Sequence, residues 1–147
     1  MSGSGFFSSK AFAVVGASAD RAKYGNRVLR WYIDNKLPVT PINARAEGEI
    51  EGLASVKALG DLQKAQQEQG GDAPLSVSVS VITPPQVSQR VVEEAAALGI
   101  RHMWFQPGSE PEALDQLGEK YGIQVISNGP CILVEGERML LAQEARL

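Results

Sequence analysis

The sequence predicts a single α/β domain built on a doubly wound parallel sheet. Short runs of β-branched and apolar residues alternate with longer segments of helical period, which is the pattern of consecutive βαβ units. Glycines and prolines separate these segments where strands and helices are expected to end. The 147 residues suffice for one ordinary domain with its own hydrophobic core. Together these observations predict a Rossmann-type domain with a five-stranded parallel sheet in the order 3-2-1-4-5.

The individual elements follow from local patterns. The five predicted strands are residues 11–15, 38–42, 75–82, 100–105 and 123–126. The other predicted segments are helices at residues 25–35 and 56–69 and an irregular or short extended stretch at residues 47–53. Thr83 and Ser109 are expected to cap the helices that follow them, because each precedes a first-turn proline and has Gln or Glu three residues later. Gly99 and Gly122 are expected to end these two helices.

The domain is expected to span residues 10–134, with a short segment on either side. Residues 1–9 are rich in Ser and Gly and lack acidic residues, but the first strand follows so closely that we expect a flexible lead and not a transit peptide. Residues 135–147 have no obvious place in the sheet. Their apolar cluster at residues 139–141 is expected to pack on the domain or on a second subunit, which would make a homodimer. The expected location is cytoplasmic.

Composition excludes several classes of partner and cofactor. Fourteen basic and seventeen acidic residues give a net charge of −3, whereas proteins that coat nucleic acid present a strongly basic face. The longest apolar runs are far shorter than a bilayer span, so we expect neither a nucleic-acid nor a membrane partner. Cys131 and His102 are the only residues of their types, which excludes an internal disulfide and a multi-histidine metal site. No metal site is expected.

Ligands of an open parallel sheet bind at the carboxyl ends of the strands, so the loops after the strands are the candidate site. The first loop begins at Gly16 and leads into a helix, which makes it a natural anion site. The dinucleotide fingerprint G-x-G-x-x-G is absent, because Ser18 and Arg21 occupy its second and third glycine positions. Asn43 and Arg45 stand where an acidic residue would hold the ribose of NAD. Arg45 either contacts a ribose phosphate, as in NADP or coenzyme A, or is an ordinary surface arginine.

The sequence contains no convincing catalytic constellation. Ser18 or Ser109 would need a base, and His102 lies early in its strand, at the far end from the loops. Lys23 suits electrostatic binding of a phosphate better than Schiff-base chemistry. Cys131 is either an ordinary buried thiol or a reactive one that faces the ligand groove.

Several short motifs, taken in order and spacing, resemble one known family. They are Val14-Val15-Gly16-Ala17-Ser18 with Lys23-Tyr24-Gly25, Pro41-Ile42-Asn43, Gly52-Leu53 with Ser55, Val81-Ile82-Thr83-Pro84, Gly99-Ile100, Trp104-Phe105-Gln106-Pro107-Gly108, and Val125-Ile126 leading to Cys131. Across residues 11–134 the chain resembles the coenzyme A-binding domain family, small proteins similar to the N-terminal domain of the succinyl-CoA ligase alpha subunit. The ligase's phosphorylated histidine belongs to a second domain, so the resemblance implies a binding module without a reaction.

The resemblance also implies which residues bind the ligand. In this family the first loop cradles phosphates, a basic residue after the second strand meets a phosphate, the third loop lies along the ligand, and the fourth borders the pantetheine arm. The corresponding positions here are Gly16, Ala17, Ser18, Ala19, Lys23 and Tyr24, then Asn43 and Arg45, then Ile82, Thr83 and Pro84, and finally Phe105, Gln106 and Pro107.

The expected function is therefore to bind coenzyme A or an acyl-CoA, with no catalysis of its own. Two alternatives remain beside it. One is an NAD(P)-binding oxidoreductase, which the missing glycines and the missing ribose acid disfavour. The other is a partner-binding module whose nucleotide groove is vestigial.

Overall fold

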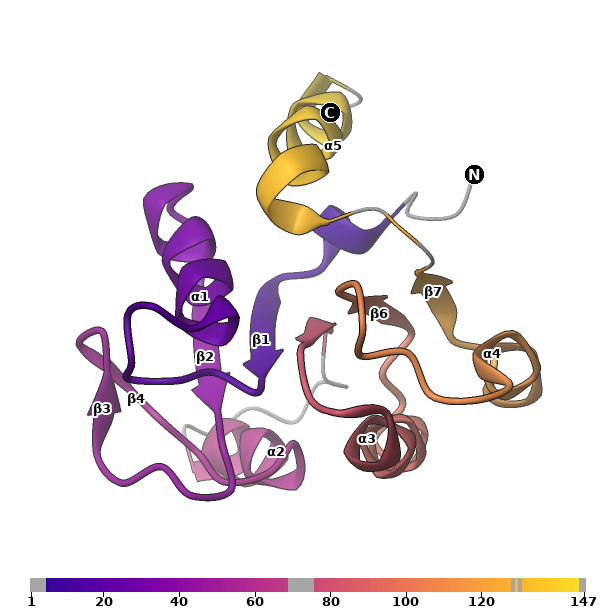
Figure 1. The fold of residues 1–147 in the computed structure, drawn as a ribbon, viewed down its shortest axis with the longest axis horizontal. Helices are drawn as coiled ribbons and strands as arrows, with labels where there is room; N and C mark the ends of the chain where they lie inside the picture. The colour runs from indigo at the N-terminus through magenta and orange to yellow at the C-terminus, as the bar shows by residue number, and fades with distance from the viewer. Residues whose placement is uncertain (1–4, 69–75, 128, 130, 146–147) are drawn as a thin grey trace.

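A computed structural model describes residues 5–68, 76–127, 129 and 131–145. Its centre is a five-stranded parallel sheet with helices on both faces (Figure 1). The sheet strands are β1 (Ala11–Val15), β2 (Val39–Ile42), β5 (Val77–Val81), β6 (His102–Phe105) and β7 (Gln124–Ile126). The helices are η1 (Phe6–Ser8), α1 (Tyr24–Asp34), α2 (Gly60–Glu68), α3 (Pro85–Ala97), α4 (Leu114–Tyr121) and α5 (Ile132–Ala145). A separate antiparallel hairpin joins β3 (Glu49–Ile50) to β4 (Leu53–Ala54).

The fold class and the five strands confirm the prediction, but the predicted strand order is wrong. The order is β2-β1-β5-β6-β7, which is 2-1-3-4-5 when only the sheet strands are counted, and not 3-2-1-4-5. The strand β2 lies at an edge, where Pro41 removes no hydrogen bond that a central strand would need. By contrast, β5 is buried along its whole length and pairs with β1 on one side and β6 on the other. Strand and helix alternate in the same way in both orders, so periodicity alone does not distinguish them.

Two hydrophobic layers enclose the sheet. In Figure 1, α1 and α5 lie above the sheet, and α2, α3 and α4 lie below it. Side chains alternate between the layers along each strand, as the two-residue period of a strand requires. On β1, for example, Phe12 and Val14 face the layer of α1 and α5, whereas Ala13 and Val15 face the layer of α3 and α4.

The Val/Ser alternation of β5 follows from the same two layers. Its valines lie in the layer of α3, and its serines lie on the opposite face, where their buried hydroxyls are paired. Ser80 Oγ and the Tyr32 hydroxyl hydrogen-bond at 2.7 Å, and Ser78 Oγ donates to the carbonyl of Phe6. Because serine is small, this face leaves room for a cluster of aromatic rings that includes Trp104.

Part of the expected flexible lead is ordered. Residues 1–4 lie outside the described residues, but Phe6–Ser8 form a 3-10 helix, with Phe6 only 1% exposed. Phe6 packs edge-on against Trp104, with ring centroids 5.5 Å apart, and Phe7 packs against Phe12 and Trp31. The burial of two aromatic side chains outweighs the Ser/Gly composition that suggested a flexible segment.

The two predicted N-caps are wrong. Helix α3 has Pro84 as its N-cap residue without a side-chain cap, and Thr83 Oγ1 instead hydrogen-bonds to a serine of the first turn at 2.8 Å. Helix α4 starts five residues after Ser109, with Ala113 as its N-cap. Ser109 Oγ is buried and donates to the carbonyl of Val81 at 2.9 Å, so it closes the loop after β6. The predicted stops are confirmed, because α3 ends just before Gly99 and α4 ends at Gly122.

Two further segments differ in extent from the prediction. The second helix starts at Gly60 and not at residue 56, because Val56 forms a parallel bridge with Ile42 at the edge of the sheet. The expected tail from residue 135 belongs to α5, which packs on α1 so closely that a Cβ at Gly136 would lie 2.6 Å from Trp31. None of the helices within the described residues is long and apolar enough to cross a membrane.

Candidate functional site

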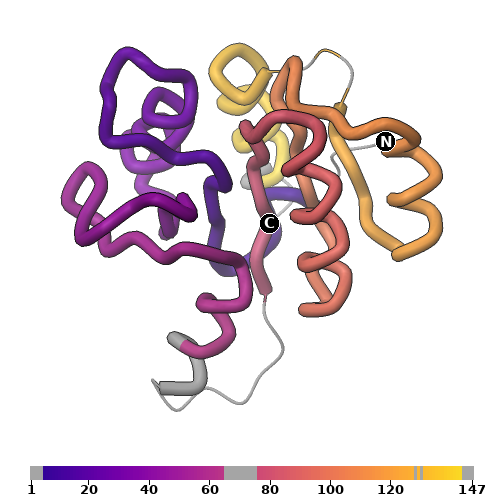
Figure 2. Tube along the Cα trace, turned by 60° about the horizontal axis from the view of Figure 1, so that its bottom comes forward, coloured from indigo at the N-terminus to yellow at the C-terminus, as the bar shows by residue number. Residues whose placement is uncertain are grey.

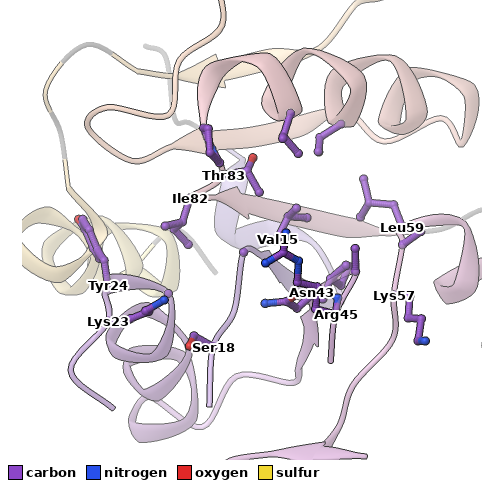
Figure 3. A pocket seen from close by; sticks show the side chains of 18 of the residues that line it. Val15, Ser18, Lys23, Tyr24, Asn43, Arg45, Lys57, Leu59, Ile82 and Thr83 are labelled. Atoms are coloured by element: carbon purple, nitrogen blue, oxygen red, sulfur yellow. Dashed lines mark hydrogen bonds between the residues drawn. The ribbon is translucent and has the colours of Figure 1, made fainter. Parts of the chain in front are cut away.

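A pocket with a volume of about 730 Å³ lies at the carboxyl ends of β1, β2 and β5. This is the switch point of the sheet, because β1 leads to α1 on one face and β5 leads to α3 on the other. The volume is typical of a pocket for a small organic ligand. Figure 3 shows Lys23 and Tyr24 at one end of the pocket, Lys57 and Leu59 at the other, and Asn43 and Arg45 between them.

The start of α1 is held against the end of β1 by close backbone packing. A Cβ at Gly25 would lie 2.0 Å from the carbonyl oxygen of Gly16, so only glycine fits there without a shift of the backbone. Gly16 has φ +97°, and a Cβ on it would press on Thr83 N at 3.3 Å. These contacts fix the first turn of α1 at the mouth of the pocket.

The backbone donors of this loop divide into two groups. The N–H groups of Gly16 and Ala17 both donate to the carbonyl of Ile42, at 2.9 and 3.2 Å, and are therefore occupied. Helix α1 has Lys23 as N-cap and no side-chain cap. Within the described residues, no acceptor is found for the N–H groups of Ser18, Ala19, Tyr24, Gly25 and Asn26. Unpaired N–H groups at the positive end of a helix dipole form an anion-binding site.

A buried amide fixes the shape of the same loop. Asn26 is fully buried, and its Nδ2 donates to the carbonyl of Ser18 at 2.8 Å and to Glu51 Oε2 at 3.1 Å. Arg30 Nε donates to Asn26 Oδ1 at 2.7 Å. Glu51 belongs to the β3–β4 hairpin, which lies beside the loop (Figure 2), and its carboxylate also pairs with Arg21 at 3.5 Å. The hairpin thus braces the loop from outside the sheet.

Three exposed cations surround the pocket. Lys23 stands at the start of α1, Arg45 follows β2, and Lys57 follows the bridge beside β2. Asn43 positions the middle one, because its Nδ2 donates to the carbonyl of Ala17 at 2.6 Å and its Oδ1 accepts the N–H of Arg45 at 2.8 Å. Among the described residues, none of the three cations has an ion-pair partner. Their charges are therefore available to an anionic ligand.

Most of the predicted site residues meet at this pocket. Those that line it are Gly16, Ser18, Lys23, Tyr24, Asn43, Arg45, Ile82, Thr83 and Pro84. The others do not: Ala17, Phe105 and Gln106 are buried, and Ala19 and Pro107 are exposed away from the lining. Ala17 is fully enclosed beneath the loop, and Phe105 points into the core of the layer formed by α3.

Sequence reasoning missed the wall formed by α3 and the segment before α2. Val87, Val91 and Glu94 lie one helical turn apart on α3, and Val87 is 38% exposed because it borders the pocket. The Glu94 carboxylate accepts the N–H groups of Leu59 and Gly60 at 3.3 and 3.4 Å. The helical spacing of these residues can be seen in the sequence, but it predicts only that they share one face of the helix. It does not distinguish a face buried in the core from one that lines a pocket.

A second cluster of polar groups lies behind Tyr24. The Tyr24 hydroxyl contacts Cys131 Sγ and donates to Gln106 Oε1 at 3.3 Å. The N–H of Ile132 donates to the same Oε1 at 2.9 Å. Burial, and next the contact with Cys131, hold the pKa of Tyr24 well above its ordinary value, so this phenol stays protonated at neutral pH. Gln106, predicted for the site, therefore meets the pocket through Tyr24.

His102 lies at the opposite end of the sheet from the pocket. It begins β6, whereas the pocket residues follow the carboxyl ends of the strands. A Cβ on Gly5 would lie 3.1 Å from its ring, and burial lowers its pKa below the ordinary value. The structure thus brings no histidine to Ser18 or to Ser109.

The fold and the pocket define a doubly wound α/β domain with an anion-binding loop at its switch point. The family described as "CoA binding domain" matches residues 10–137, and the chain belongs to this family.

Solved structures share the fold. A conserved hypothetical protein from Pyrococcus furiosus is 35% identical, with a TM-score of 0.71 over 86% of this chain and 98% of that one. A protein from Thermus thermophilus is 26% identical, with a TM-score of 0.75 over 92% of this chain and 94% of that one. A hypothetical protein from Pyrococcus horikoshii shows the same fold at 22% identity, with a TM-score of 0.75 over 93% and 88% of the two chains.

Proposed function

We propose that the protein binds coenzyme A or an acyl-CoA in the pocket at the switch point. The observation that carries the proposal is the separation of two anion-binding positions within one pocket. The unpaired N–H groups at the start of α1 form the first, and Arg45 with Lys57 forms the second. Coenzyme A also carries two separate anionic groups, a diphosphate and a phosphate on its ribose.

The proposed orientation follows from the positions of these groups. The diphosphate lies on the N–H groups of α1 beside Lys23, because the helix dipole favours an anion there. The ribose phosphate lies between Arg45 and Lys57, on the β2 side of the pocket. Ile82, Thr83 and Pro84 then border the ligand from the β5 side, and the pantetheine arm runs toward Tyr24.

The residues present fit this ligand better than NAD. An NAD site needs an acidic residue after the second strand to bind the ribose hydroxyls. Asn43 occupies that place, and its side chain is hydrogen-bonded to the backbone of Ala17 and Arg45. Glu94 is a carboxylate in the pocket wall, but it accepts the first N–H groups of α2. NADP remains the second candidate, because Arg45 would also suit its additional phosphate.

The proposed function is binding without a chemical step. Within the described part of the chain, the acidic and basic side chains of the pocket are the cations Lys23, Arg45 and Lys57 and the hydrogen-bonded Glu94. Cations bind phosphate, but no group here is placed to act as a general base.

A thermal-shift panel with coenzyme A, acetyl-CoA, dephospho-CoA, NAD and NADP tests the proposal. A ligand at one hundred times its Kd stabilises the folded protein by about 2.7 kcal/mol, which raises the melting temperature by several degrees. We expect the largest shift with coenzyme A or acetyl-CoA and a smaller one with dephospho-CoA. A shift with NADP alone would support the oxidoreductase, and no shift with any of the five would contradict nucleotide binding.

A further inference from the structure

The single cysteine lies one side chain away from the pocket. Cys131 is half-buried at the start of α5, where its carbonyl accepts the N–H groups of Val134 and Glu135 at 3.0 and 2.8 Å. Its Sγ contacts the hydroxyl of Tyr24, and Tyr24 itself lines the pocket. Either the Tyr24 hydroxyl or the Cys131 thiol can donate in this contact, so one side chain separates the thiol from the pocket.

A buried amide in the same cluster lacks a partner. Gln106 is 1% exposed, and its Oε1 accepts from both Tyr24 and the N–H of Ile132. The N–H of Ile132 can only donate, so the atom facing it must be the amide oxygen. The Nε2 group is then left, buried, without an acceptor among the described residues. Buried donors are rarely unpaired in folded proteins, so this amide is the group of the cluster that remains free to donate to a ligand.

The order of the strands places this cluster where the reactive end of the ligand is expected. From β2 across the sheet come β1, β5, β6 and β7. The ribose phosphate is proposed on the β2 side, and the pantetheine arm therefore points toward the loops after β6 and β7. Gln106 follows β6 and Cys131 follows β7. The amide carbonyls of the pantetheine arm would suit the free Nε2 of Gln106, and its terminal sulfur would lie near Cys131.

We propose that Cys131 is a site of thiol–disulfide exchange with disulfides of coenzyme A. The inference rests on the proposed function of the pocket. The Cys131 thiolate attacks the sulfur that carries the bound coenzyme, and the S–S bond of the incoming disulfide breaks as the Cys131–coenzyme A bond forms. The second thiol leaves as a thiolate and takes up the proton that Cys131 has lost. A reducing thiol reverses the step, so the coenzyme is held covalently only under oxidising conditions.

Intact-protein mass spectrometry after incubation with coenzyme A disulfide tests this inference. Because the chain contains one cysteine, any adduct that dithiothreitol removes lies on Cys131. We expect one coenzyme A per chain and no adduct on Cys131→Ser. The matched reagent is oxidised glutathione, which has the same disulfide but no nucleotide, and we expect it to react at least about tenfold more slowly, since it gains no binding in the pocket.

An Arg45→Ala variant distinguishes a directed reaction from that of an exposed thiol. Arg45 lines the pocket but is not part of the Tyr24–Gln106–Cys131 cluster. We expect the variant to react about tenfold more slowly with coenzyme A disulfide and at an unchanged rate with oxidised glutathione. Absence of an adduct would overturn the inference. So would equal reaction rates with coenzyme A disulfide and oxidised glutathione in both the wild type and Arg45→Ala.

Calorimetry distinguishes failure of the proposed exchange site at Cys131 from failure of the proposed function of the pocket. Reduced coenzyme A is titrated into the wild-type protein and into Cys131→Ser, whose hydroxyl preserves a polar contact with Tyr24. Reversible binding to both proteins, with no adduct on the wild type, would refute the exchange site and leave the proposed function intact. No binding to either protein would refute both.

Discussion

Helices α1 and α4 each follow a parallel strand of the same sheet, and both lack a side-chain cap. They differ in the charge of the residues around their N-termini. The first turn of α4 contains Asp115, and Glu110 and Glu112 precede it in the chain. The first turn of α1 contains no acidic residue and has Lys23 as its N-cap. A helix dipole favours negative charge at its N-terminus, and α4 supplies that charge itself. Of these two helices, α1 is the one that leaves the position open for a ligand.

The difference indicates how a binding site can be recognised in a repetitive fold. Every parallel strand leads toward a helix N-terminus, so topology alone offers several equivalent anion sites. Two carboxylates lie near the start of α1. Asp20 accepts the N–H of Ala22 at 3.0 Å, and Glu51 is held by the side chains of Asn26 and Arg21, so neither is paired with the N–H groups of the helix. Charge around the helix start therefore distinguishes α1 from α4. Helix α3 also lacks an acidic first turn, but it offers fewer free donors, because Pro85 has no N–H and the N–H groups of Val87 and Ser88 donate to the carbonyl of Pro84.

The largest expected effect comes from moving the start of α1. Gly25→Ala adds a Cβ that would lie 2.0 Å from the carbonyl oxygen of Gly16, so the backbone must shift. We expect a loss of about 3 kcal/mol in the free energy of unfolding and no measurable binding of coenzyme A. Urea denaturation and calorimetric titration measure the two effects.

Gly60→Ala is the matched control for Gly25→Ala. Gly60 also opens a helix, but the nearest atom to its added Cβ is a carboxylate oxygen of Glu94 at 3.7 Å. The free energy of unfolding of Gly60→Ala should therefore remain close to that of the wild type. If Gly25→Ala behaved like Gly60→Ala in both measurements, the close packing of α1 on β1 would not be what fixes the anion site.

The next effect concerns the second anion-binding position. Arg45→Ala should weaken coenzyme A binding by about 1.5–3 kcal/mol, or roughly ten- to a hundredfold, because a charge-assisted hydrogen bond is lost. Dephospho-CoA lacks the ribose phosphate and should bind both proteins almost equally. Calorimetry with both ligands decides the matter, and equal losses for the two would assign Arg45 to another part of the ligand.

A capping residue should make α1 resemble α4. Lys23 occupies the N-cap position with extended backbone angles, φ −81° and ψ 150°, which suit an Asp cap. We expect Lys23→Asp to stabilise the free protein by about 0.5–2 kcal/mol, because its carboxylate accepts N–H groups of the first turn. The same carboxylate should weaken coenzyme A binding at least about tenfold, since it competes with and repels the diphosphate.

Lys23→Gln separates these two effects. Glutamine removes the positive charge of Lys23 without adding a carboxylate to the helix start. It should weaken binding less than aspartate does and leave stability near the wild-type value. If Lys23→Asp lowered stability, or left the affinity unchanged, the start of α1 would not be an open anion site.

The sequence predicted the parts of the fold that depend on local pattern. Strand β1 is found at the predicted residues 11–15, and α1 begins one residue before its predicted start, because alternation and helical spacing are properties of neighbouring residues. The strand order depends on which strands meet, and the informative signal was Pro41, which marks an edge strand. The cap at Ser109 failed because its hydroxyl closes a loop with β5, a contact between distant segments. The cap at Thr83 failed because α3 begins at Pro85, which makes Pro84 its N-cap residue.

The residues of the candidate site also divide into those that the sequence predicted and those that it did not. Residues in the loops after β1, β2 and β5 were identified because topology brings those loops together. Lys57 and Glu94 were missed because they reach the pocket through a bridge to β2 and through the far end of α3. Gln106 was predicted as a ligand contact but is buried, and only its hydrogen bond with Tyr24 connects it to the pocket.

The smallest expected effect lies at α4, the helix that neutralises its own N-terminus. Asp115→Asn removes a negative charge from the first turn without changing the size of the side chain. Because α4 then lacks part of the charge that complements its dipole, we expect the free energy of unfolding to fall by about 0.3–1 kcal/mol at low salt, and by less when salt screens the interaction. Affinity for coenzyme A should not change, since Asp115 lies outside the pocket at the switch point.

Urea denaturation at two salt concentrations and calorimetric titration provide the comparison with Lys23→Asp. Opposite signs in stability for the two variants, with a change in affinity only for Lys23→Asp, would establish that the two helix starts differ in charge and not in geometry. A gain in coenzyme A binding by Asp115→Asn would instead show that α4 is a second anion site that its own acidic residues normally block.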